Sequence, residues 1–129
     1  MDANELRSAG TIVGELVRDP GGDDHDVPGT EREGANIKGA DHGASISLIL
    51  DESEPGQGPR LHRHPYDETW VVQEGNLTFQ YGDERLALGA GDIVIVPPGV
   101  PHKFTNDGPD RSKLVCIHAS PTFIGEWLE

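Results

Sequence analysis

Apolar and polar side chains alternate in short segments along much of the chain. The segment at 44–50 reads ASISLIL, in which Ile46, Leu48 and Leu50 share one parity. The segment at 77–81 alternates in the same way. Because successive side chains of a β-strand point to opposite faces, a period of two predicts half-buried strands.

Glycine and proline separate these segments, as expected of turns between strands. The chain has 17 glycines and 10 prolines among 129 residues, enough length for one domain with its own core. The pattern predicts eight to ten short strands and no helix, which favours a small β-barrel or jelly roll. The expected strands are 11–17, 44–50, 62–64, 68–72, 77–81, 85–88, 93–96, 102–106 and 113–119.

The strands imply a layout within one all-β domain. Residues 44–120 are expected to form the barrel core. Residues 1–43 would supply a first strand and an acidic loop rich in glycine and proline, and residues 121–129 would form a short C-terminal tail. The apolar side chains of this tail are expected to require shielding from water by other parts of the protein.

The acidic loop at 19–34 reads DPGGDDHDVPGTEREG, in which Val27 is the only large apolar residue. Such a segment cannot bury enough surface to offset the entropy lost on ordering. We therefore expect an exposed or partly disordered excursion. His25 within it is interpreted as a solvated histidine.

Charge limits the partners. Ten basic side chains against 23 acidic ones give a formal net charge of -13. Such a surface repels phosphate backbones and anionic lipid headgroups, so no nucleic-acid or membrane partner is expected. No apolar run reaches the length of a membrane span, and the residues at 1–9 lack the features of a secretory signal. A cytoplasmic location is expected.

Three histidines and one glutamate carry the candidate chemistry. His62 and His64 stand two residues apart, so on a strand both rings face one side. Glu68 opens the next strand, where it would return its carboxylate to the level of the histidines. His102 lies on a later strand and shares its parity with Phe104, which would direct it inward.

Three neutral imidazoles and one carboxylate form a ligand set for a divalent transition metal. Fe, Mn, Ni, Co, Cu and Zn all suit such ligands, so the sequence does not name the ion. The single carboxylate leaves a net positive centre that can attract an anionic or oxygen-donor ligand. A metal that prefers six ligands would keep two positions for water or substrate. The alternative is a set of hydrogen-bonded core histidines.

Parity with the four ligands predicts a mostly apolar pocket for a small molecule. Ordinary core packing is the alternative for each aromatic residue taken singly. His118 is interpreted as a structural residue or as a neighbour of the ligands, and His42 as a loop residue. The expected pocket residues are Trp70, Val72, Phe79, Ile93, Ile95 and Phe104, with Gln57, Arg60 and Tyr81 as polar contacts near its edge.

The middle of the chain carries Gly56, His62, His64, Glu68 and Gly75, followed by Gly91, Pro97, Gly99, His102 and Asn106. These two spaced motifs resemble those of the cupin superfamily, in particular its small single-domain members. Fifteen residues, 76–90, separate the motifs, a short spacing associated with compact microbial members. Every fixed position agrees, which makes the resemblance specific.

The resemblance implies a conical jelly-roll barrel, also called a double-stranded β-helix. It implies a divalent metal held near the barrel axis by the three histidines and Glu68. It also implies a homodimer.

Two classes of function follow. The first is a metal-dependent enzyme acting on a small organic molecule, with dioxygenase chemistry favoured and Glu68 as ligand or transient base. Isomerase or lyase chemistry at the same centre is the enzymatic alternative. The second class is a non-catalytic module that binds a small molecule or a metal.

Overall fold

The computed structural model describes residues 33–129, which form ten short strands and one turn of 3-10 helix, η1 (Gly39–His42). The expected strand at 11–17 and most of the acidic loop at 19–34 lie outside the described residues. None of the helices among these residues is long and apolar enough to cross a membrane. The strands are β1 (Glu33–Ile37), β2 (Ser47–Ser53), β3 (His62–Arg63), β4 (Glu68–Glu74), β5 (Asn76–Tyr81), β6 (Glu84–Gly89), β7 (Ile93–Val96), β8 (His102–Asn106), β9 (Ser112–His118) and β10 (Glu126–Trp127).

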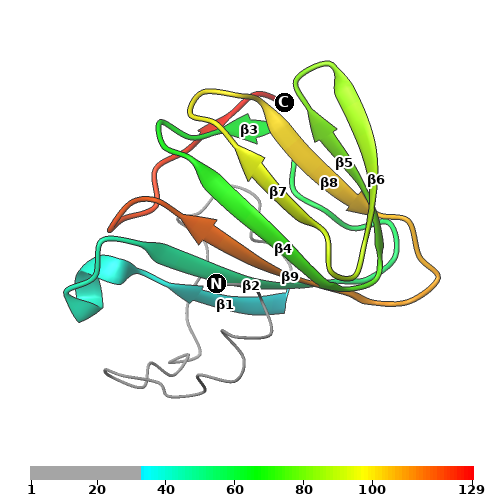
Figure 1. The fold of residues 1–129 in the computed structure, drawn as a ribbon, viewed down its shortest axis with the longest axis horizontal. Helices are drawn as coiled ribbons and strands as arrows, with labels where there is room; N and C mark the ends of the chain where they lie inside the picture. Colours follow the sequence, from blue (N-terminus) through cyan, green and yellow to red (C-terminus); the bar gives the residue numbers. More distant parts are fainter. Residues whose placement is uncertain (1–32) are drawn as a thin grey trace, which may run out of the picture.

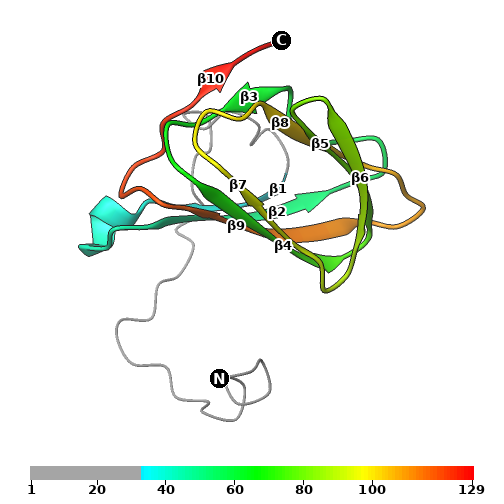
Figure 2. The ribbon, with the colours of Figure 1, turned by 45° about the horizontal axis from the view of Figure 1, so that its top comes forward.

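The strands form two antiparallel five-stranded sheets that face each other (Figures 1 and 2). The first sheet has the order β1-β2-β9-β4-β7, and the second has the order β10-β3-β8-β5-β6. Neighbouring strands are often distant in sequence, as in the pairing of β2 with β9. The architecture is therefore the all-β jelly roll that the sequence predicts.

The inner faces of the two sheets enclose one apolar core. Trp70 of β4 lies at its centre and meets Phe79 and Phe104 edge-on, at ring-centroid distances of 4.7 and 5.0 Å. Perpendicular contacts of this kind favour aromatic pairs beyond the area that they bury. The core consists of Ile49, Trp70, Val72, Leu77, Phe79, Val96, Phe104, Leu114 and Cys116.

The inward and outward faces of strand β7 are the reverse of those predicted. Ile93 and Ile95 are 63% and 64% exposed, so the prediction that they line an interior pocket is wrong. The register explains the error, because Val94 pairs with the buried Trp70 of β4 and therefore shares its inward face. In an unbroken apolar run, the parity alone does not reveal the buried side.

Two strands went unrecognised in the sequence. Strand β1 begins at Glu33, so the acidic loop does not continue to Gly34 as expected, and it pairs with β2 along its whole length. Strand β10 pairs with β3 and brings the C-terminal segment against the histidine strand. Both strands are short and lack a clear alternation of apolar and polar residues. Only their pairing with β2 and β3 identifies them as strands.

The motif glycines allow backbone conformations that other residues rarely adopt. Gly56, Gly75, Gly91 and Gly99 all have positive φ, the region that L side chains rarely adopt. At Gly75, φ is 101° and a Cβ atom would lie 2.8 Å from Cβ of Ser112, so the turn from β4 to β5 requires glycine.

Asn106 of the second motif also serves the fold. Its side-chain amide donates to the carbonyl oxygens of Ser53 and Asp110, both at 2.9 Å, and its Oδ1 accepts from the N–H of Gly108 at 2.8 Å. These three hydrogen bonds fasten the end of β8 to the end of β2 and to the loop that follows β8.

Candidate metal centre

Two rows of side chains face each other across one end of the barrel. In the second sheet His62 of β3 lies directly opposite His102 of β8. Glu68 begins β4 of the first sheet, and His64 comes directly after β3 of the second sheet. The structure therefore brings together the four residues that the sequence singles out, and it buries all of them, with exposed fractions of 1–3%. One ligand atom from each lies within 4.8 Å of the others.

Backbone carbonyls fix the orientation of the three imidazole rings. The Nδ1 atoms of His62, His64 and His102 lie 2.7, 2.7 and 2.8 Å from the carbonyl oxygens of Arg60, Ile124 and Val100. A carbonyl oxygen can only accept, so each Nδ1 carries a proton, and in the neutral imidazole each Nε2 then keeps a lone pair for a metal. Metal-ligating histidines are held in this way in proteins.

The carboxylate of Glu68 lies among these lone pairs. Its Oε1 is 3.2 Å from Nε2 of His64 and 3.0 Å from Nε2 of His102. Burial by itself would raise the pKa of Glu68, but the facing His118 holds this pKa well below its usual value. The side chain is therefore an anionic oxygen donor at neutral pH.

Burial, reinforced by the neighbouring His102, lowers the pKa of His62 from 6.5 to about 3. His62 is thus neutral at physiological pH, so no proton has to leave before a metal binds.

The donor set fits a divalent metal. Nε2 of His64 is buried and has no hydrogen-bond partner, a costly arrangement that a metal ion would satisfy. Three imidazole nitrogens with one carboxylate oxygen match the borderline ligand preferences of first-row divalent ions.

The metal-free protein is expected to lose stability as the pH falls below about 6.5. There the unfolded chain protonates His62, whereas the folded chain keeps it neutral down to about pH 3. The unfolded state then binds more protons, so the free energy of unfolding falls by up to about 1.4 kcal/mol per pH unit.

Chemical denaturation with a chelator present measures this slope. The pH range runs from 7.5 down to 4.5, the ordinary pKa of a glutamate. His62→Asn removes the titrating ring and should flatten the profile. An equally steep profile in that variant would assign the pH dependence to other groups.

The predicted aromatic pocket is a packed core. Trp70, Val72, Phe79 and Phe104 are at most 2% exposed and contact one another beneath the histidines. Trp70 also lies edge-on to His102 at a centroid distance of 5.6 Å. These side chains therefore support the ligands from below, which is the core-packing alternative left open by the sequence.

The three predicted polar contacts lie in different places. Tyr81 pairs directly with His102 across β5 and β8, so it is half-buried beside the cluster. The guanidinium of Arg60 lies 4.1 Å from the ring centroid of Trp127 and is turned toward the C-terminal segment. The backbone carbonyl of Gln57 accepts from the N–H of Asn106, at the end of β8 away from His102, so Gln57 is not part of the cluster.

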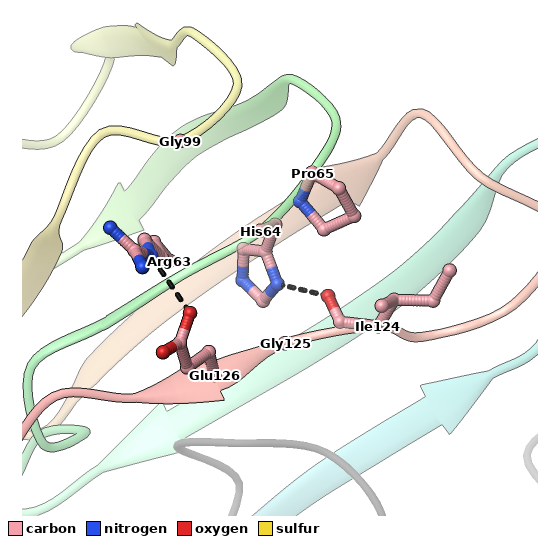
Figure 3. Close-up of a pocket in the computed structure, with 7 residues that line it drawn as sticks. All are labelled: Arg63, His64, Pro65, Gly99, Ile124, Gly125 and Glu126. Atoms are coloured by element: carbon pink, nitrogen blue, oxygen red, sulfur yellow. Dashed lines mark hydrogen bonds and ion pairs between the residues drawn. The ribbon is translucent and has the colours of Figure 1, made fainter.

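A surface cavity of about 290 Å³ borders the cluster where the C-terminal segment passes β3 (Figure 3). The imidazole of His64 forms one wall and donates to the carbonyl of Ile124 on the opposite side. An exposed ion pair between Arg63 and Glu126, 2.9 Å long, lies at the rim. Of the residues that line this cavity, sequence analysis had placed only His64 in the site.

His118 was interpreted from the sequence as a structural residue or a neighbour of the ligands, and Tyr66 was given no role in the site. His118 lies opposite Glu68 in the register of β9 and β4, and only 1% of it is exposed. Its parity with the buried Leu114 and Cys116 was the available signal. The role of Tyr66 depends on a contact with His118, 52 residues away, and has no local signal.

A family model described as a cupin domain matches residues 50–118, more than half of the chain. A crystal structure of an uncharacterized Klebsiella pneumoniae protein with a double-stranded β-helix domain superposes with a TM-score of 0.67 at 26% identity, covering 82% of this chain and 93% of that one. Oxalate decarboxylase of Lactobacillus farciminis superposes with a TM-score of 0.67 at 23% identity, covering 81% and 34%, and shows the fold alone.

Curated relatives are more varied. Protein SchB of Streptomyces halstedii is 30% identical over 74% of this chain and 73% of its own length. Polyketide synthase CurC of Streptomyces cyaneus is 35% identical over 52% of this chain, and acireductone dioxygenase of Danio rerio is 33% identical over 50%. The chain spans less than half of the latter two proteins, 44% and 36% of their lengths.

Proposed function

The chain belongs to the cupin family, and on that premise we propose that it binds one divalent transition-metal ion through His62, His64, Glu68 and His102. We propose further that it uses this ion to act on a small organic molecule with dioxygenase-type chemistry.

One observation carries the proposal of a metal site. The Nδ1 atoms of the three histidines all donate to backbone carbonyls, which leaves three Nε2 lone pairs converging on one buried carboxylate. A set of core histidines without a metal function would not require the same tautomer three times. The metal, when bound, would supply Lewis acidity and positions for substrate and O₂.

The protein side chains supply orientation and exclusion of water. Glu68 provides the single negative charge of the site, so the loaded site would keep a positive charge that favours an oxygen-donor substrate. Trp70 and Phe104 close the apolar floor beneath it. The similarity to acireductone dioxygenase supports oxygen chemistry, and the similarity to polyketide synthase CurC supports an oxygen-rich substrate such as a polyketide.

Oxygen consumption tests the reaction. Protein loaded anaerobically with Fe²⁺ is expected to consume O₂ when mixed with a substrate from a panel of catechols, flavonols, diketones and polyketide-like phenols. His102→Ala, which removes a ligand, should reduce this rate at least tenfold, whereas His42→Ala on the exposed η1 turn should not. If no substrate supports uptake, the dioxygenase proposal is wrong, and isomerisation of sugars or keto acids is the next reaction to assay.

We also propose that two copies associate through the outer face of the first sheet. Register places two rows of side chains there across four strands, Leu48–Ile117–Thr69–Ile95 and Leu50–Val115–Val71–Ile93. None of these residues is charged, and the exposed fractions of Leu50, Ile93 and Ile95 are 40%, 63% and 64%. An apolar sheet face of this kind is typical of interaction sites. In a chain of net charge -13, this face is also where two copies would repel each other least.

Analytical ultracentrifugation of the full chain is expected to show twice the chain mass. The double substitution Ile93→Lys with Ile95→Lys should yield a folded monomer, because lysines would be brought together at the interface. Leu86→Lys is the matched control, since Leu86 is 43% exposed on β6 of the other sheet. A wild-type monomer, or a dimer that the double variant leaves intact, would exclude this interface.

A further inference from the structure

A buried histidine and a tyrosine lie behind Glu68, outside the proposed ligand set. His118 is 1% exposed and lies directly opposite Glu68 in the pairing of β9 with β4. Its Nε2 is 3.2 Å from Oε2 of Glu68, while Oε1 of the same carboxylate is turned toward His64 and His102. The two oxygens of Glu68 therefore have different neighbours.

A backbone N–H indicates which atoms donate in the hydrogen bonds of Tyr66 and His118. The N–H of Ile124 donates to the hydroxyl oxygen of Tyr66 at 3.3 Å. The hydroxyl hydrogen of Tyr66 is thus free to donate to Nδ1 of His118, 2.6 Å away. A neutral imidazole that accepts at Nδ1 carries its proton on Nε2, and that proton faces Glu68.

His118 thus has the opposite tautomer to the three proposed ligands. His62, His64 and His102 each donate from Nδ1 to a carbonyl and leave Nε2 as a lone pair. His118 accepts a hydrogen bond from the hydroxyl of Tyr66 at Nδ1 and carries a hydrogen-bond donor at Nε2. The Nε2–Oε2 contact falls short of regular hydrogen-bond geometry, so Nε2 is buried with Glu68 as its ionic neighbour.

We propose that Tyr66 and His118 are positioning residues, which hold Oε2 of Glu68 from behind so that Oε1 stays directed at the metal centre. The inference rests on the proposed metal site and goes beyond it, because it assigns two residues that the motifs do not contain. Partners that orient a ligating carboxylate from outside contribute strongly to metal affinity.

Two further features agree with this role. Burial raises the pKa of Tyr66 to about 12, so its hydroxyl keeps the hydrogen that the arrangement needs. Burial opposes ionisation of Glu68, yet its pKa is held well below the usual value, as a donor at Nε2 of His118 beside Oε2 would favour. His118 therefore acts on the charged form of the carboxylate.

The hydrogen-bond arrangement can be tested without any metal. Long-range ¹H–¹⁵N NMR spectra of the histidine rings in the metal-free full chain should show the Nε2–H tautomer for His118 and the Nδ1–H tautomer for His62, His64 and His102. In Tyr66→Phe the tautomer preference of His118 should weaken while the other three rings are unchanged. A dominant Nδ1–H tautomer of His118 in the wild type would overturn the inference and would suit a fifth metal ligand instead.

Metal affinity tests the consequence. Co²⁺ binding, measured by competition with a chelator, should weaken about 10- to 100-fold in His118→Leu. His118→Gln, whose amide can donate at the place of Nε2, should recover part of this loss. The visible spectrum of bound Co²⁺ should shift in the Leu variant and return toward wild type in the Gln variant, which a merely structural defect would not produce.

His42→Gln is the matched control, because His42 is an exposed histidine on η1. Equal affinity and an unchanged Co²⁺ spectrum in His118→Leu would overturn the positioning role while the proposed metal site stands. A wild-type chain that fails to bind Co²⁺ or any other divalent ion would overturn both.

Discussion

Alanine at His62, His64 or His102 is expected to abolish stable metal binding. Each substitution removes one of the four ligand atoms that lie within 4.8 Å of one another. Affinity should therefore fall by more than the roughly 100-fold typical of residues that only support a ligand. Elemental analysis after dialysis against a chelator should give about one ion per wild-type chain and less than about a tenth of that in each variant.

The fold should survive these substitutions, because the apolar core centred on Trp70 and Phe79 does not need the ion. Circular dichroism of the three variants should retain the β-sheet signal of the wild type. His42→Ala serves as the control, since it removes an exposed histidine. Full metal occupancy in all three ligand variants would show that the ion, if present, binds elsewhere.

Trp70→Ala is expected to lower the free energy of unfolding by about 3–5 kcal/mol, the usual cost of removing a large aromatic side chain from a packed core. Trp70 is 1% exposed and contacts Phe79 and Phe104 edge-on, so the cavity left behind cannot close without moving both sheets. Urea denaturation followed by circular dichroism measures the change.

The matched control is Leu86→Ala on the edge strand β6, where the leucine is 43% exposed. Its effect should stay within about 0.5 kcal/mol. Wild-type stability in Trp70→Ala, with loss of ligand binding only, would restore the view that Trp70 lines a substrate pocket. A large loss of stability assigns it to the core.

The sequence pattern misassigned the faces of β7 and gave no sign of the two short strands β1 and β10. The period of two located β2, β5 and β8, but the run of apolar residues in β7 offered both parities. Only the pairing of Val94 with Trp70 decides that Ile93 and Ile95 point outward. The sequence analysis could not supply that register, because it depends on residues more than twenty positions away.

The candidate site shows the same division. The spacing of His62 and His64 and the two motifs were enough to select the proposed ligands. The groups that orient them come from elsewhere, since Nδ1 of His64 donates to the carbonyl of Ile124, sixty residues further on. A backbone carbonyl has no signature in a sequence, so this support was invisible before the fold was known.

By itself, the sequence determined the all-β class, the motif glycines and the four proposed ligands, because strand period, turn chemistry and ligand spacing are local properties. Tertiary structure alone decided which faces are buried, which imidazole nitrogen carries each proton, and that Tyr66 and His118 lie behind Glu68. These features depend on contacts between distant segments, and the free energy of packing two sheets against each other selects among the alternatives that local patterns leave open.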